Sequence, residues 1–206
     1  GNNFGNVQLA SITLAKVTQP SGDLQEFNIN LSGPTTGTVG LQDGESFPRT
    51  NMLLSGTYTV TEDSVEGWDL TDVTCLDGDG SVGDNIYDEE EILNGKEFNL
   101  EAGHEVTCTF TNTKRGSVTI LKASQPDGTF EFNLIGETDD GDVEETQSII
   151  TEEGSGEITF GNLLSGEYDI RETVLDGWKE PTIDCLLNGE EEVDNTSFEL
   201  PAGGNV

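Results

Sequence analysis

Short runs of alternating apolar and polar residues recur along the whole chain. Clear examples occupy residues 11–14, 27–31, 58–61 and 106–110, with Gly, Asn, Asp and Pro between the runs. Alternation with a period of two is typical of antiparallel strands that have one buried and one solvated face. The chain has no convincing amphipathic pattern of three helical turns. The pattern therefore predicts an all-β protein built as a β-sandwich.

The same segments occur twice, in the same order. GSVTILK at 116–122 repeats ASITLAK at 10–16, and LLSGEYDIRE at 163–172 repeats LLSGTYTVTE at 53–62. A Gly-Trp pair followed by a Cys also returns at an unchanged Trp-to-Cys spacing: Gly67, Trp68 and Cys75, then Gly177, Trp178 and Cys185. Repetition of whole strand patterns over this length predicts two tandem domains of about 100 residues each.

The second copy lacks the segment that closes the first. The first copy ends in VTCTFTNT at 106–113, whereas the second stops at Val206, the equivalent of Val106. Residues 1–6, GNNFGN, align with residues 107–112 and follow Val206 without a gap. We therefore expect the 206 residues to be one period of a longer array.

In that array, residues 1–7 form a strand that completes the second domain of the preceding repeat. The first sandwich then spans residues 8–114, and the second spans 115–206 without its own last strand. Two arrangements fit: one polypeptide running through many periods, or separate subunits that each insert this strand into a neighbour. A domain without its last strand exposes an unpaired ladder, which favours such pairing. A third interpretation is that the two ends are arbitrary boundaries.

The chain is strongly acidic, with 41 Asp and Glu against 8 Lys and Arg and a formal net charge of −33. Nucleic acid and anionic membrane surfaces need a basic face, so neither is expected as a partner. No apolar run approaches the roughly 20 residues of a membrane span, and we expect no direct membrane insertion by this segment. A solvated surface explains the acidity; a salty habitat and calcium-loaded loops are the alternatives.

Three cysteines predict one disulfide. Cys75 follows the strand that begins near Trp68, and Cys108 lies on the last strand of the first copy, so these two are expected to pair. Cys185 is left over, because the position equivalent to Cys108 falls on Asn2 of the next unit. It is either a buried thiol or an intermolecular link. A disulfide within one domain indicates an oxidising, extracellular setting.

An acidic loop after Cys75 is a candidate calcium site. Its oxygen-bearing residues alternate with glycine, although the loop fails the EF-hand pattern because Val82 stands where Gly is needed. Turns favour Asp and Gly in any case, so a plain turn is the alternative. The candidate ligands are Asp77, Asp79, Ser81 and Asp84. No other cofactor is expected.

The repeated elements resemble the prealbumin-like Cna-B/SpaA-type repeat domains of bacterial and archaeal surface proteins, adhesins and pilins. The likeness lies in the opening strand ending in Lys16, the Leu-Ser-Gly-x-Tyr-x-Val-x-Glu segment, the Gly-Trp pair and the closing Thr-Asn-Thr. It covers nearly the whole chain, because the elements recur in the second copy. The resemblance implies two tandem immunoglobulin-like (prealbumin-like) β-sandwich domains at a cell surface.

That family often forms a spontaneous isopeptide bond between a Lys on the first strand and an Asn or Asp on the last, assisted by a Glu on a middle strand. The resemblance implies one set of residues for each domain: Lys16, Glu62 and Asn112; and Lys122 and Glu172 with Asn6 of the following unit. A strand-end Lys paired with Glu, without a covalent bond, is the alternative.

Repeats that contact only their neighbours build quasi-linear rods. The resulting hypothesis is a structural repeat module of an extracellular fibre, stalk or pilus-like filament, assembled head to tail with copies of itself. The alternative is an adhesin module that binds a host or glycan ligand through its loops. The chain has no Ser/His/Asp set, phosphate-binding Gly loop or His/Cys metal cluster, so no enzyme activity is expected beyond autocatalytic isopeptide formation.

Overall fold

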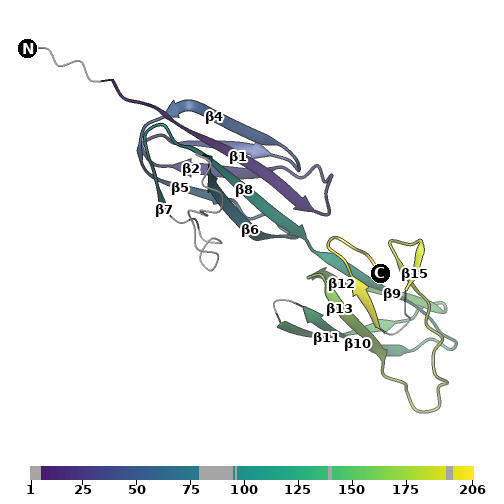
Figure 1. The fold of residues 1–206 in the computed structure, drawn as a ribbon. Coiled ribbons are helices and arrows are strands. Elements are labelled where there is room, and N and C mark those ends of the chain that lie inside the picture. Colours follow the sequence, from purple (N-terminus) through teal and green to yellow (C-terminus); the bar gives the residue numbers. More distant parts are fainter. Residues whose placement is uncertain (1–5, 79–94, 96, 139–140, 194–196) are drawn as a thin grey trace, which may run out of the picture. The chain divides into compact units, whose positions relative to one another are not determined.

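The computed structural model describes residues 6–78, 95, 97–138, 141–193 and 197–206 (Figure 1). Strands, turns and irregular segments make up this described part of the chain, which contains no helix. Accordingly, none of the described segments is a helix long and apolar enough to cross a membrane. The chain divides into two compact units, Gly1–Thr113 and Lys114–Val206. The prediction of an all-β protein is confirmed.

The first unit is a sandwich of two four-stranded sheets. One sheet has the order β4-β1-β8-β6 and the other the order β3-β2-β5-β7. The strands are β1 (Ala10–Gln19), β2 (Phe27–Ser32), β3 (Gly37–Leu41), β4 (Ser46–Leu53), β5 (Gly56–Glu62), β6 (Trp68–Asp77), β7 (Glu97–Leu100) and β8 (Glu105–Lys114). The first and last strands, β1 and β8, run parallel, and their register joins nine residue pairs.

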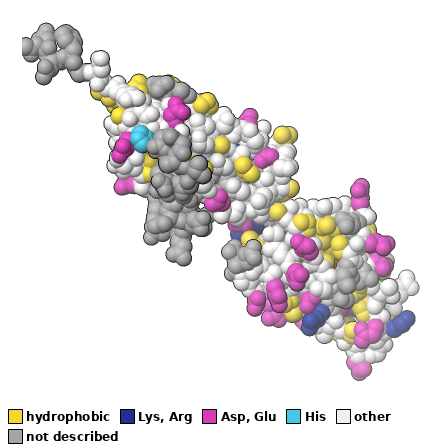
Figure 2. Space-filling view, in the orientation of Figure 1, with side chains coloured by type: hydrophobic (Ala, Val, Ile, Leu, Met, Phe, Trp, Pro, Cys, Tyr) yellow, Lys and Arg dark blue, Asp and Glu magenta, His cyan; other side chains and the backbone are white. Residues whose placement is uncertain are grey.

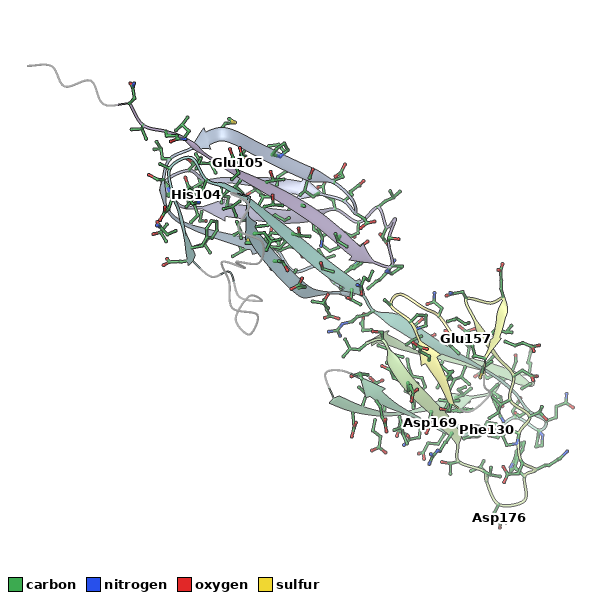
Figure 3. The ribbon with its side chains drawn as sticks, in the orientation of Figure 1. His104, Glu105, Phe130, Glu157, Asp169 and Asp176 are labelled. Carbon is green, nitrogen blue, oxygen red and sulfur yellow. A yellow bond between two sulfur atoms is a disulfide. The ribbon has the colours of Figure 1, made fainter. Side chains whose placement is uncertain are left out.

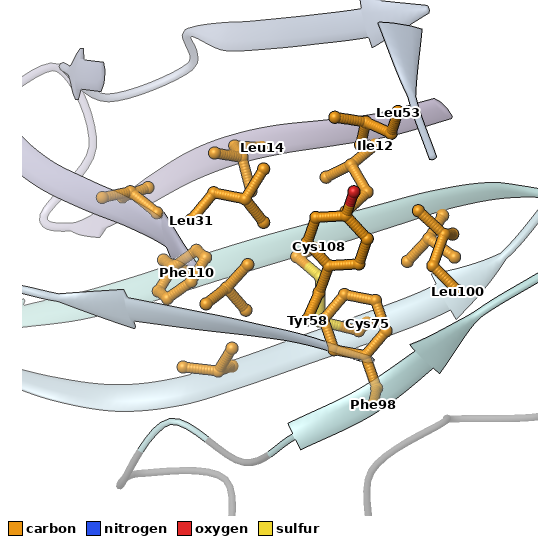
Figure 4. Close-up of a cluster of buried hydrophobic side chains, with 14 of the residues drawn as sticks. Ile12, Leu14, Leu31, Leu53, Tyr58, Cys75, Phe98, Leu100, Cys108 and Phe110 are labelled. Atoms are coloured by element: carbon orange, nitrogen blue, oxygen red, sulfur yellow. A yellow bond between two sulfur atoms is a disulfide. The ribbon is translucent and has the colours of Figure 1, made fainter. Parts of the chain in front are cut away.

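Alternation along these strands decides which side chains enter the core. In β1 the even-numbered residues from Ile12 to Thr18 are buried, so Lys16 points inward with its apolar neighbours. Ile12, Leu14, Tyr58 and Phe110 pack together in the core (Figure 4). Full burial of a side chain such as Phe110 contributes about 1.5–3 kcal/mol to stability.

Both units contain the same tyrosine arrangement, which explains the repeated Leu-Ser-Gly-x-Tyr segment. The hydroxyl of Tyr58 donates to the carbonyl of Leu54 at 2.9 Å, and that of Tyr168 donates to Leu164 at 2.8 Å. Each ring is buried, and this bond satisfies the one polar atom that it carries into the core. The segment therefore fixes the start of β5 and of its counterpart in the second unit.

The second unit has a complete four-stranded sheet in the order β11-β10-β13-β16, and two-stranded sheets β12-β9 and β14-β15. The strands are β9 (Gly116–Ala123), β10 (Thr129–Thr138), β11 (Gly141–Ile150), β12 (Ser155–Leu163), β13 (Gly166–Glu172), β14 (Cys185–Leu187), β15 (Glu191–Val193) and β16 (Ser197–Leu200). Phe132, Leu134, Phe160 and Tyr168 are among its core residues.

The two units differ at the positions that β6 and β8 occupy in the first unit. There β8 lies between β1 and β6. In the second unit β9 pairs with β12 on one side, while residues 178–184, which correspond to the start of β6, are irregular. The strand expected from the repeated Trp-to-Cys segment is thus reduced to the short β14. The physical reason is that a strand needs a neighbouring strand to hydrogen-bond its backbone N–H and C=O groups.

Candidate functional site

Three polar side chains meet inside the first unit: Lys16 from β1, Glu62 from β5 and Asn112 from β8. The Lys16 amine donates to Asn112 Oδ1 at 2.5 Å, and Asn112 Nδ2 donates to Glu62 Oε1 at 2.7 Å. The amine also lies 3.4 Å from Glu62 Oε2. The parallel register causes the first contact, because it sets Lys16 opposite Phe110, two residues before Asn112.

This cluster is almost completely shielded from water. Lys16 is 1% exposed and Asn112 is 2% exposed, and only 2% of the Glu62 side chain is accessible. An aromatic pair covers the amine: the Phe27 ring centroid lies 4.3 Å from Lys16 Nζ, and Trp68 packs edge-on against Phe27 at 5.3 Å. The site is therefore a dry pocket with one amine, one carboxyl and one carboxamide.

Burial changes the acidity of both ionisable groups. Desolvation lowers the pKa of the Lys16 amine below its ordinary value, although the adjacent Glu62 carboxyl acts in the opposite direction. Desolvation likewise raises the pKa of Glu62, against the opposing effect of Lys16. Both shifts favour the neutral forms: an amine with a free electron pair and a protonated carboxyl.

Neutral forms in this geometry suit attack of the amine on the carboxamide. In such a reaction Lys16 Nζ would be the nucleophile, and the Asn112 side-chain carbonyl would be the electrophile. Glu62 reaches both ends of the reaction, because Oε1 contacts the amide nitrogen that would leave and Oε2 lies near the attacking nitrogen. Oε2 makes no hydrogen bond to the part of the chain that is described, which leaves it open for proton transfer.

The second unit holds two of the three groups. Lys122 Nζ lies 2.7 Å from Glu172 Oε2, and Phe130 lies 4.6 Å from the amine, with Trp178 edge-on against Phe130 at 5.0 Å. Figure 3 labels Phe130 in this unit. Asn6, the third expected member, is exposed and precedes β1. The pair is more open than its counterpart, with 14% of the Lys122 side chain and 7% of the Glu172 side chain accessible.

The aromatic pairs were missed at the level of sequence. Phe27 and Phe130 each occupy the first inward position of the second strand of their unit, facing the Lys of the first strand. The only available signal was that a Phe precedes Glu62 in the first copy and Glu172 in the second. Ordinary core residues recur in both copies in the same way.

A groove lies beside Lys122 in the second unit. Its volume is about 560 Å³, and strand β9 forms one wall while residues 181–186 form the other. Phe132 and Ile170 contribute apolar surface, and Lys122 and Glu172 also line it. In the first unit, the corresponding space between β1 and β6 is filled by β8.

Asn205 and Val206 lie at one end of this groove. They pair with β9 in the same register in which β8 pairs with β1 in the first unit. Asn205 pairs in parallel with Ser117, as Glu105 does with Ser11. Val206 then bonds Ser117 and Thr119 through its amide and carbonyl, which places it opposite Val118. The other wall matches as well, because Asn188 donates to the Asn205 carbonyl at 2.6 Å as Gly78 does to Glu105 at 2.5 Å.

The disulfide predicted between Cys75 and Cys108 is confirmed, with an S–S distance of 2.05 Å, and it joins β6 to β8. Cys185 is half-buried at the start of β14 and lines the groove, so it is less buried than a core thiol. Of the calcium candidates, Asp77 is the last residue of β6, and Asp79, Ser81 and Asp84 lie outside the described residues. The described residues contain no group of three or more His, Cys, Asp or Glu placed to hold a metal.

Replacing Cys75 and Cys108 together by Ala is expected to lower the free energy of unfolding of the first unit by about 3–4 kcal/mol. The bond closes a loop with a sequence separation of 33, and the chain-entropy account gives this magnitude. Urea denaturation of the oxidised proteins measures it. Cys185→Ala is the matched control and should change stability by less than about 1 kcal/mol. Equal stability of the double variant and the wild type would contradict the structural role.

Comparison with known proteins adds a family assignment. The family model described as a prealbumin-like fold domain matches residues 12–114, half of the chain, and this stretch contains Lys16, Glu62 and Asn112. No curated protein matches the chain.

Three solved structures illustrate distant likenesses. The Bacillus anthracis TIE protein is 17% identical with a TM-score of 0.37, covering 96% of this chain and 32% of that one. The streptococcal ancillary pilin is 16% identical with a TM-score of 0.37, covering 95% and 62%. A C-terminal fragment of the pilus adhesin SpaC from Lactobacillus rhamnosus GG is 15% identical with a TM-score of 0.33, covering 96% and 95%. The chain thus spans less than two thirds of the first two.

The family assignment rests on the match to residues 12–114 together with the sandwich that these residues form. The chain belongs to the family of proteins with a prealbumin-like fold domain.

Proposed function

We propose that this chain is a structural repeat module of an extracellular fibre, stalk or pilus-like filament. Successive copies of the module join head to tail by sharing a strand. The observation that carries the proposal is the groove between β9 and residues 181–186. On this proposal the two units of the chain are tandem prealbumin-like domains, and a strand from the neighbouring copy of the module completes the second domain.

The proposed occupant is the segment 1–6 of the next unit, inserted parallel to β9. Its sequence matches residues 107–112 of β8, with Phe4 in the place of Phe110. Phe110 is 1% exposed in the core of the first unit, and the groove offers Phe132 and Ile170 for the equivalent contact. The inserted backbone would bond β9 and residues 181–186 at once, as β8 bonds β1 and β6. The donor is either a separate copy or the next repeat of one polypeptide.

The first unit has the geometry of a load-bearing element. The chain enters it at the start of β1 and leaves at the end of β8, and these parallel strands share nine residue pairs. Tension between entry and exit therefore loads the whole ladder in shear instead of opening pairs one by one. We further propose that Lys16 and Asn112 form an isopeptide bond assisted by Glu62, which would hold β1 and β8 together under load.

An extracellular location agrees with the disulfide and with the acidic surface. Figure 2 shows Asp and Glu side chains spread over the visible face of both units. Among the residues that the structure describes, none supports the adhesin alternative. Trp68 and Trp178 pack against Phe27 and Phe130 and do not form an exposed aromatic strip.

The test is the size of the 206-residue chain as a function of its concentration. We expect head-to-tail oligomers that lengthen with concentration, and a largely monomeric Phe4→Ala chain, because burial of one Phe contributes about 1.5–3 kcal/mol, a factor of roughly 10 to 150 in affinity. Sedimentation or light scattering measures the size. Phe47→Ala is the control, since Phe47 is 40% exposed on β4. Wild-type chains that stay monomeric, or Phe4→Ala chains that assemble normally, would contradict the proposal.

A further inference from the structure

We propose that Asp43 is a positioning residue for amide-bond formation in the first unit: its carboxylate holds the end of β1 so that Lys16 stays aligned with Asn112. This inference rests on the isopeptide bond proposed above for these two residues. Asp43 lies in the turn between β3 and β4, and it acts on the reacting groups through the backbone of β1.

The turn that carries Asp43 holds the backbone of β1 at Lys16. The Lys16 amide donates to the carbonyl of Glu45 at 3.0 Å, and the Gly44 amide donates to the carbonyl of Lys16 at 3.0 Å. Strand β4 begins only at Ser46, so these bonds continue the β1–β4 ladder into the turn. The backbone at Lys16 is therefore fixed by β8 on one side and by the turn on the other.

Beyond Lys16, the side chain of Asp43 replaces the backbone as the acceptor. The Thr18 amide donates to Asp43 Oδ1 at 2.6 Å, and the Gly22 amide donates to Asp43 Oδ2 at 2.7 Å. Thr18 is 2% exposed, and a buried N–H group without an acceptor is costly in free energy. One carboxylate thus ties the end of β1 to the loop that follows it.

The end of β1 matters because it faces the carboxamide. Thr18 stands opposite Asn112 in the parallel register of β1 and β8. Lys16 stands opposite Phe110, and its amine reaches along the strands to the Asn112 side chain. A shift of the end of β1 would therefore change the distance and the angle at which the amine meets the carboxamide. A misplacement of about 1 Å can slow a reaction by about 100-fold.

The second unit builds the same junction differently. The amide of Ser124, at the repeat position of Thr18, donates to the backbone carbonyl of Gly154 at 3.0 Å. A carboxylate again joins the two loops, but it is that of Asp127 in the loop after β9. It accepts from the amides of Glu153 at 3.1 Å and Gly154 at 2.7 Å. The end of β9 therefore has a backbone partner, whereas the end of β1 depends on a side chain.

The charge of Asp43 would hinder the reaction if it acted alone. Hydrogen bonds from the Gly22 and Thr18 amides hold the pKa of the Asp43 carboxyl below its ordinary value, so the group is ionised at neutral pH. This negative charge acts to raise the pKa of the Lys16 amine, against the larger effect of burial. Attack on the carboxamide needs the neutral amine. A benefit from Asp43 must therefore come from the position that it gives to β1.

The experiment follows link formation over time in full-length chains made by cell-free synthesis. Protease digestion and mass spectrometry give the fraction of chains in which the peptides carrying Lys16 and Asn112 are joined. Asp43→Asn keeps the shape but can accept only one of the two amide hydrogens. Asp43→Glu keeps the charge but displaces the carboxylate by one methylene. Each should slow linking at least about tenfold.

Two controls separate positioning from a general loss of stability. Asp127→Asn removes the same kind of contact from the second unit and should link at the wild-type rate. Each substitution is also made in the Glu62→Gln chain, in which no link is expected, and urea denaturation of that chain measures its cost in stability. Linking is compared at a temperature at which circular dichroism shows every variant folded, so a purely structural role would leave the rate unchanged.

The outcomes distinguish the positioning role from the bond itself. Slow linking in either folded Asp43 variant, with the wild-type rate in Asp127→Asn, supports the role. Wild-type rates in both Asp43 variants, or faster linking in Asp43→Asn, would overturn it and leave the isopeptide bond intact. A wild-type chain that never links would overturn the bond and the positioning role together.

Discussion

Replacing Glu62 by Gln is expected to leave Lys16 and Asn112 unlinked in an otherwise folded first unit. Gln has nearly the same shape, but it cannot accept the amine proton and return it to the leaving nitrogen. The variant should keep the ammonia that the wild type loses, about 17 Da after correction for the substitution. Protease digestion and mass spectrometry measure this, because in the wild type the peptide carrying Lys16 should be joined to the peptide carrying Asn112.

The loss of this bond should have a large effect on stability. The linked residues are 96 positions apart, and closing a loop of that size contributes up to about 4–5 kcal/mol in the chain-entropy account. The Cys75–Cys108 disulfide already shortens the loop, so a somewhat smaller loss is expected. Glu97→Gln, an exposed position on β7, is the matched control and should keep the cross-linked peptide. Unlinked peptides in the wild type would contradict the isopeptide bond and leave only the buried contact.

The strands and their inward-facing positions were predictable, because the alternation of apolar and polar residues indicates which side chains face the core. Ile12, Leu14 and Lys16 share one parity, so the sequence places the lysine on the core face once Ile12 and Leu14 are assigned there. The pairing of Cys75 with Cys108 followed from their places on two strands. These inferences depend on local pattern and on residue type.

The aromatic cover and the far wall of the groove were not predictable in this way. Phe27 contacts Lys16 through the packing of one sheet on the other, which local alternation does not encode. Residues 178–184 repeat the pattern that forms β6 in the first unit, yet they are irregular. Their state depends on whether a strand lies beside them, and that is a property of tertiary pairing.

A cysteine placed at position 2 should report the inserted strand directly. Cys185 holds the repeat position of Cys75, and Asn2 holds that of Cys108. Cys75 and Cys108 form a disulfide, with Cα atoms 4.0 Å apart. A strand seated in the groove in the β8 register would bring residue 2 within bonding range of Cys185. Asn3 would face the opposite side of the inserted strand, because side chains alternate.

The most direct measurement is therefore disulfide formation by Asn2→Cys, made in the Asn6→Ala chain so that the isopeptide bond that the family resemblance implies between Lys122 and Asn6 cannot obscure the result. We expect oligomers on non-reducing gels that collapse to monomers on reduction, with peptides carrying residue 2 and Cys185 joined between chains. Asn3→Cys in the same background should give few or none. Absence of the bond between residue 2 and Cys185, or equal cross-linking from position 3, would contradict strand sharing between units.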